Sequence, residues 1–137
     1  MTGSIIVDTS ALMSLLFQEP DAESLAVALT VATELRMAAP TWLESAIVVT
    51  TRRGDAGYQR FQQILQGLGV EVVSCDRTLS EIAFQAWCQY GKGRHPAGLN
   101  YGDCFSYALA KQRGEPLLFK GSDFSKTDIQ SAIVSET

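Results

Sequence analysis

Apolar residues follow two different spacings along this chain, and the two alternate. Short continuous runs such as Ile5-Ile6-Val7 are typical of buried strands, whereas apolar positions three or four apart are typical of helices. Strands are predicted over residues 4–8, 37–39, 70–74, 116–119 and 132–134. Helices are predicted over residues 10–17, 21–36, 41–53, 55–66, 76–90 and 101–113. The alternation predicts an α/β fold, in which helices cover both faces of a central, mostly parallel sheet of about four to five strands.

Residues typical of helix ends support this division. Thr41-x-x-Glu44 has the form of a capping box, in which two side chains each bond the other residue's backbone N–H. Asn100 is expected to cap the helix that follows it, and Gly54 to separate two helices. No repeat, low-complexity tract or linker divides the sequence, so we expect a single domain over residues 1–137.

Two carboxylates lie at or just past the ends of predicted strands. Asp8 ends the run Ile5-Ile6-Val7, and Asp123 follows the strand at 116–119, after Gly121. Ligands of open α/β sheets collect beyond the carboxyl ends of the strands, so both acids are candidates for a binding site. Each also has an ordinary explanation, since Asp8 would serve as the N-cap of the next helix and Asp123 as a turn residue.

Two further acids lie near expected helix starts. Glu44 shares a helix face with Ile47 and Val48, where a carboxylate is costly unless it is paired or bound to a metal. Asp103 falls in a first helical turn, beside Gly102, which allows close approach of the backbone. The alternatives are a capping-box role for Glu44 and a favourable interaction with the helix dipole for Asp103.

These four acids share one feature, because strand ends and helix starts meet at one edge of an α/β sheet. They are Asp8, Glu44, Asp103 and Asp123. Clustered carboxylates repel one another unless a cation lies between them. Ligands that are all oxygen suit Mg²⁺ or Mn²⁺, and no set of His and Cys suggests zinc. We therefore expect a divalent-metal site, with Thr9 and Ser10 capping the helix and holding the carboxylate or a metal-bound water.

Composition narrows the class of protein. With 137 residues, 46% of them hydrophobic, the chain suits one globular domain, and it carries neither a membrane-length apolar run nor a signal-peptide pattern. Cys75, Cys88 and Cys104 form no metal-type pair and are expected to be reduced core thiols in a cytoplasmic protein. The formal net charge of −4 argues against a broad nucleic-acid-binding face, but it leaves room for a local basic rim.

Four segments resemble the sequence blocks of PIN-domain ribonucleases and, more narrowly, of the VapC toxins of bacterial and archaeal toxin–antitoxin pairs. They are IIVDTSALMSLL, TWLESAIVV, GKGRHPAGLNYGDCFSYALAK and LLFKGSDFSKTDI. By position, the family's acidic quartet matches Asp8, Glu44, Asp103 and Asp123. The family often has a further acid or amide beside the fourth acid, and this chain has Ser122 there.

The resemblance implies a PIN-like three-layer sandwich and an Mg²⁺- or Mn²⁺-dependent endoribonuclease that cuts structured RNA, often tRNA or rRNA. It also implies a homodimer and inhibition by a small cognate antitoxin, whose tail enters the active-site groove. Such a metal lowers the pKa of bound water and stabilises charge on the scissile phosphate. Asp103 or Glu44 would orient or deprotonate that water, and in-line attack would leave a 5′-phosphate and a 3′-hydroxyl.

RNA must still approach an acidic protein. Lys92, Arg94 and Lys120 flank the predicted site in sequence, so we expect them to contact RNA phosphates. The other basic residues considered for this rim are equally explained as solubilising charges: Arg52, Arg53, Arg60, Lys111, Arg113 and Lys126. His95 is expected to be a loop residue rather than a general acid.

Two other functions remain open from the sequence. A phosphoacceptor receiver domain shares the architecture, the acid at the first strand tip and a late lysine, for which Lys120 would serve. It needs an acidic neighbour for Asp8, however, and Val7 and Thr9 flank Asp8. A PIN-like domain that only binds RNA or protein would have no catalytic activity, and the intact acidic quartet argues against it.

Overall fold

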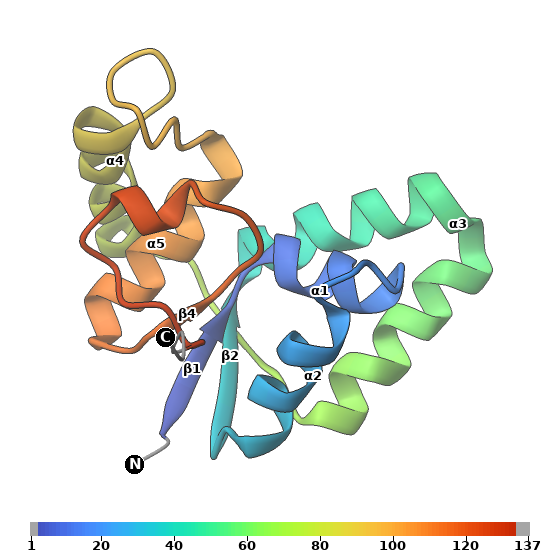
Figure 1. Ribbon diagram of the computed structural model, residues 1–137. Coiled ribbons are helices and arrows are strands. Elements are labelled where there is room, and N and C mark those ends of the chain that lie inside the picture. Colours follow the sequence, from blue (N-terminus) through green and yellow to red (C-terminus); the bar gives the residue numbers. More distant parts are fainter. Residues whose placement is uncertain (1–2, 134–137) are drawn as a thin grey trace.

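The computed structural model describes residues 3–133 and places a parallel sheet between two layers of helices (Figure 1). The strands are β1 (Ser4–Val7), β2 (Glu34–Ala38), β3 (Glu71–Val73) and β4 (Leu117–Leu118), paired in the order β3-β2-β1-β4. The helices are α1 (Thr9–Leu16), α2 (Ala22–Val31), α3 (Ala39–Leu68), α4 (Arg77–Tyr90) and α5 (Tyr101–Arg113), followed by the short 3₁₀ helix η1 (Phe124–Lys126). The predicted α/β class is confirmed, with four strands.

Each face of the sheet has its own hydrophobic core. Ile6 and Leu117 pack on the side of α4 and α5, whereas Val7 and Leu118 pack on the side of α1, α2 and α3. Successive strand residues point to opposite faces, so a strand covered on both sides must be apolar throughout. This explains the uninterrupted apolar run of β1.

The parallel register brings the carboxyl ends of three strands to the same edge of the sheet. Ile6 of β1 is level with Arg36 of β2 and with Leu117 of β4. Asp8 therefore leaves β1 at the edge where α3 begins after β2 and where the segment leading to Asp123 leaves β4. This edge holds the candidate site.

The helix predicted over 21–36 is wrong at its carboxyl end. Helix α2 ends at Val31, and residues 34–38 form β2, which also replaces the strand predicted over 37–39. Leu35 and Met37 are both buried, on either side of Arg36, as in a strand of period two. The helical spacing of the preceding leucines continues through Leu35 by coincidence, and pairing with β1 and β3 decides the structure.

The predicted capping box at Thr41 and Glu44 is also wrong. Helix α3 begins at Ala39, with Ala38 as its N-cap and a proline in the first turn. The predicted break at Gly54 is present as a kink, with φ 63° and ψ −157°, inside one long helix. At α5 the prediction is confirmed, because Asn100 and Asp103 form a capping box there.

The chain's last strand and its cysteines differ from expectation. Ser131 makes an isolated parallel bridge with Leu117, residues 132–133 lie outside any strand, and residue 134 is outside the described residues. All three cysteines are free, but Cys88 is exposed, so the expectation of three core thiols is wrong for it. No helix in residues 3–133 is long and apolar enough to cross a membrane.

Candidate active site

Asp8 is the most firmly held of the four acids. Its side chain is only 3% exposed, and Oδ2 accepts hydrogen bonds from Ser10 N at 3.0 Å and from Ser10 Oγ at 2.6 Å. The other oxygen, Oδ1, accepts from Ser106 Oγ of α5 at 2.5 Å. Asp8 is therefore the N-cap of α1, as its ordinary explanation requires, and is also fixed against a helix from the opposite layer.

Glu44 reaches the same edge from the second turn of α3. Its Oε1 accepts from Thr9 Oγ1 at 2.7 Å, which links it to the residue next to Asp8. Its Oε2 lies against Gly102, where an added Cβ would be only 2.3 Å from that oxygen. Gly102 is therefore required for the close approach of α3 to α5.

Asp103 brings the third carboxylate, on the first turn of α5. Its Oδ2 accepts from Asn100 N at 3.0 Å, and its own N–H donates to Asn100 Oδ1 at 2.9 Å. The capping box explains the position of Asp103. It does not make the charged form of the carboxyl favourable at that position. Burial, together with the charges of Asp8, Glu44 and Asp123, raises its pKa to about 7, although the hydrogen bond from Asn100 N lowers it.

Asp123 is exposed and lies at the start of η1, where its side chain makes no capping bond. Its charge reaches Asp103, so the fourth acid also belongs to this electrostatic group. The segment before it is tied to the site, because Lys120 N donates to Ser10 Oγ at 3.0 Å. The Ser122 carbonyl accepts a hydrogen bond from Ser125 Oγ at 2.5 Å.

The pKa of Glu44 is also raised, first by burial and then by the charge of Asp8, while the hydrogen bond from Thr9 lowers it. The pKa values of Glu44 and Asp103 are therefore both raised, so both carboxyls lose their protons less readily than usual. This indicates that the described part of the protein places no compensating positive charge beside them.

The residues present fit a hydrated divalent ion better than a fully protein-bound one. No three acidic, histidine or cysteine side chains within residues 3–133 form a ready metal cage. The oxygens are instead partly engaged in hydrogen bonds, as at Asp8 and Asp103. Mg²⁺ usually keeps several waters and uses one or two protein carboxylates. All-oxygen donors that repel one another suit such an ion.

Sequence reasoning missed a set of buried hydroxyls behind the acids. Thr41 Oγ1 and Ser106 Oγ are 3.3 Å apart, and Ser45 Oγ donates to Thr9 Oγ1 at 3.1 Å. Ser106 is fully buried and bonds Asp8 directly. The available signal was its position three residues after Asp103, on the same face of α5.

The three basic residues expected to contact RNA have different surroundings. Lys120 Nζ is 2.5 Å from Glu19 Oε1, and Arg94 stacks over Trp87 at 4.7 Å while Nε donates to the Cys88 carbonyl. Lys92 is exposed. Their role in RNA binding stays a prediction.

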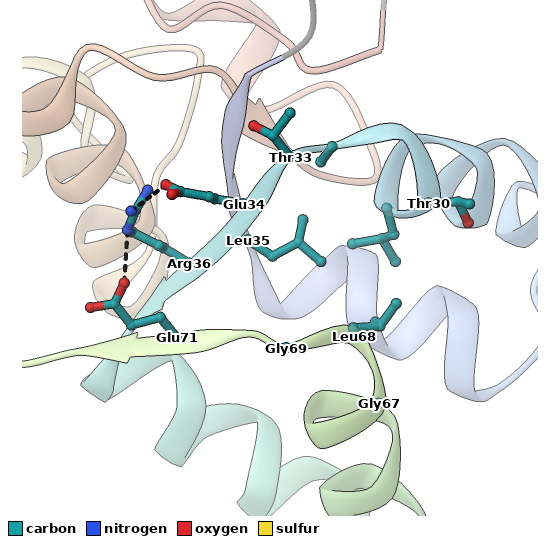
Figure 2. Close-up of a pocket in the computed structure, with 11 residues that line it drawn as sticks. Thr30, Thr33, Glu34, Leu35, Arg36, Gly67, Leu68, Gly69 and Glu71 are labelled. Atoms are coloured by element: carbon teal, nitrogen blue, oxygen red, sulfur yellow. Dashed lines mark hydrogen bonds and ion pairs between the residues drawn. The ribbon is translucent and has the colours of Figure 1, made fainter.

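A separate polar hollow of about 470 Å³ lies at the other edge of the sheet, near the amino ends of β2 and β3. Figure 2 shows the residues that line it. Arg36 pairs there with Glu34 at 2.5 Å and with Glu71 at 2.9 Å, and also with Glu115 at 3.4 Å. Arg36 is already paired with three carboxylates, so this hollow has the character of a structural ion-pair network.

Comparison with known sequences identifies close relatives. The model of the PIN domain family matches residues 5–130. A "Ribonuclease VapC" of Mycolicibacterium smegmatis is 47% identical over 125 residues, which cover 91% of this chain and 97% of that protein. "Ribonuclease VapC30" of Mycobacterium tuberculosis is 46% identical, with coverage of 91% and 95%.

Solved structures share the fold at lower identity. Mycobacterium tuberculosis VapC20, described as a "Sarcin-Ricin loop cleaving toxin", has a TM-score of 0.74 at 19% identity, with coverage of 91% and 95%. A toxin–antitoxin complex from Klebsiella pneumoniae has a TM-score of 0.70 at 16% identity, with coverage of 96% of both chains. These likenesses place the four-stranded sheet and its helices in one known architecture.

Proposed function

The chain belongs to the PIN-domain family and, within it, to the VapC ribonucleases, the toxins of toxin–antitoxin systems, and from this premise we propose how it works. It is a divalent-metal-dependent endoribonuclease of a single domain that acts in the cytoplasm. Its active-site acids are Asp8, Glu44, Asp103 and Asp123. The observation that carries this proposal is the convergence of the acids at one edge of the sheet: Ser106 of α5 bonds Asp8, Glu44 lies against Gly102, and the pKa of the neighbouring Asp103 is raised.

Each side chain has a separate task in this mechanism. Asp8, held by Ser10 and Ser106, and the nearby Asp103 would hold Mg²⁺ or Mn²⁺. When bound, the ion supplies Lewis acidity, which activates water and stabilises charge on the phosphate. Glu44, oriented by Thr9, or Asp103 takes the proton of the attacking water. The water oxygen bonds to phosphorus and the bond from phosphorus to the 3′-oxygen breaks. The leaving 3′-oxygen takes a proton from solvent, so the products end in a 5′-phosphate and a 3′-hydroxyl.

Structured RNA, tRNA or rRNA, is the proposed substrate. Family membership supports this class, and VapC20 of Mycobacterium tuberculosis is described as cleaving the sarcin-ricin loop. Fully paired RNA would present only its backbone, so an accessible loop is the expected place of cutting.

A cognate antitoxin is the proposed partner, and helix α2 offers a surface for it. Val27 and Val31 are 57% and 53% exposed, so they do not face the sheet. With Ala28 and Ile133 they border a hollow of about 630 Å³. Exposed apolar surface of this kind marks protein-binding sites.

A homodimer is also proposed, with the aromatic surface of α4 and α5 as its contact. Phe84 is 62% exposed and stacks on Trp87, with ring centroids 6.3 Å apart, and Tyr101 is 81% exposed. Aromatic residues are enriched at interfaces between subunits. Light scattering of the wild type and of Phe84→Glu tests this: loss of the dimer in the variant is expected, and a monomeric wild type contradicts it.

Sequencing the RNA ends produced by the purified protein tests the main proposal. In Mg²⁺ or Mn²⁺ the wild type should create new 5′-phosphate ends at discrete positions in structured RNA. Asp103→Asn should create none while its circular dichroism spectrum stays that of a folded protein. Wild-type protein that creates no new ends in either metal contradicts the ribonuclease proposal.

A further inference from the structure

Part of the chain's positive charge is already neutralised within the molecule. The basic residues that form ion pairs in the described part of the chain are Arg36, Arg77, Lys111, Arg113 and Lys120. None of these pairs involves the arginines of α3, which are Arg52, Arg53 and Arg60. These three are also exposed.

Two of these arginines share one aromatic ring. The guanidinium carbons of Arg52 and Arg53 lie 4.6 Å and 4.9 Å from the centroid of Phe17, at the end of α1. The two charges are therefore at most about 10 Å apart, close to the screening length of ~8 Å at physiological salt. Stacking holds both side chains before any ligand arrives, which lowers the entropy lost on binding.

The backbone of α3 is shaped to present this cluster. The kink at Gly54 needs a positive φ of 63°, which favours glycine. At Gly57 an added Cβ would be 2.3 Å from the Cβ of Arg53. Arg53 and Arg60 thereby line one hollow of about 230 Å³ with Phe17.

The cluster lies on α3, which carries Glu44, and at the end of α1, whose N-cap is Asp8. Helices α1 and α3 pack against each other (Figure 1), and the first begins beside Asp8. Arg52 follows Glu44 by eight residues, which is about 12 Å along the helix axis. A strand of RNA cut at the acids would reach the arginines within a few nucleotides.

We infer that Arg52, Arg53 and Arg60 bind the sugar–phosphate backbone of the RNA substrate beside the cut site. This inference rests on the proposed ribonuclease function. Guanidinium groups bond phosphate through two parallel N–H donors, and phosphate contacts position RNA without reading its sequence. The net charge of the chain is −4, so we expect the strongest phosphate contacts at a cluster of arginines that has no carboxylate partner within residues 3–133.

This assignment differs from the one drawn from the sequence. Lys120 points to Glu19 and Asp21, and the guanidinium of Arg94 bonds the Cys88 carbonyl. Both would first give up an existing partner to contact RNA. The arginines of α3 have no carboxylate partner to give up among the described residues, and neither has Lys92, which stays a candidate.

The test is RNA affinity over a salt series for Arg52→Gln/Arg53→Gln, measured in an Asp103→Asn background so that the RNA stays intact. The probe is a fluorescein-labelled single-stranded RNA of roughly 30 nucleotides, between about 50 and 200 mM salt. Loss of two phosphate contacts should reduce the slope of log K against log salt by about 1.4 and weaken binding at least about tenfold. Arg52→Lys/Arg53→Lys should keep the slope.

A matched control removes the same charge elsewhere. Arg77→Gln/Arg113→Gln takes away two arginines that already have carboxylate partners, so the slope should not change. An unchanged slope in the α3 variant overturns the inference. This holds even if the variant binds an acidic peptide more weakly than the wild type does, because the arginines would then serve a protein partner and not RNA. The single variant Arg52→Gln should give half the effect and avoids the tight packing at Gly57.

Metal-dependent cleavage by the wild type is measured separately. Absent cleavage contradicts the ribonuclease function itself. Cleavage together with an unchanged salt slope contradicts only the role of the α3 arginines.

Discussion

Replacing Asp103 with asparagine is expected to stabilise the metal-free protein at neutral pH. Asparagine keeps an oxygen for the 3.0 Å bond from Asn100 N and removes a charge that Asp8, Glu44 and Asp123 repel. A carboxyl whose pKa rises from 3.8 to about 7 on folding costs roughly 4 kcal/mol above pH 7. Because Asp103 is only half-buried, solvent screening reduces the expected gain to about 1–2 kcal/mol.

The direction of the pH dependence follows from the raised pKa. Asp103 binds its proton more tightly in the folded state, so its contribution to stability is greatest below about pH 4 and is lost as the pH rises through about 7. In a chelator the wild type should lose this stability over that window, and Asp103→Asn should not. Adding Mg²⁺ should restore more stability to the wild type than to the variant.

Urea unfolding followed by circular dichroism, in chelator at several pH values, measures this difference. Asp76→Asn is the matched control, because Asp76 caps α4 through Leu79 N at 2.9 Å and asparagine can make the same bond. Its stability should follow the wild type across the pH range. If Asp103→Asn is less stable than the wild type at pH 8, or shows the same pH slope, the repulsion inferred for this site is absent.

Three further predictions concern the site and its biology. Gly102→Ala should lower RNA cleavage at least about tenfold, because the new methyl group would be 2.3 Å from Glu44 Oε2, and full activity would contradict the close packing. In a thermal melt the higher helix propensity of alanine should offset much of the loss of stability. Ser106→Ala should lower the unfolding free energy by about 1–3 kcal/mol, because Asp8 loses a buried hydrogen-bond donor. The exposed control Ser125→Ala should change it by less than about 0.5 kcal/mol, and equal effects would contradict the role of Ser106 in holding Asp8. Induced expression should stop growth of a host that carries the target RNA, and co-expression of the cognate antitoxin should relieve it, so harmless expression of the active protein speaks against the toxin function.

Local sequence signals were sufficient for two of the acids. Asp8 ends an apolar run that only a strand buried on both faces explains, and its helix follows at once. Asp103 and Asn100 form the capping box that their spacing predicts. Both positions depend on neighbours in sequence, which is why they could be placed without a structure.

The contacts that complete the site depend on packing between distant segments. Ser106 bonds Asp8 from a helix 98 residues later, and Thr9 bonds Glu44 across 35 residues. Periodicity gives no distance between such pairs. The same limit explains the error at Leu35, whose helical spacing was overridden by strand pairing.

RNA cleavage at controlled free Mn²⁺ tests most directly whether these acids form a metal-dependent ribonuclease site. The initial rate should be negligible in excess chelator, rise with free Mn²⁺ and reach a plateau, with Asp103→Asn inactive throughout. Cleavage by the wild type at an undiminished rate in excess chelator would contradict the site proposed for this protein.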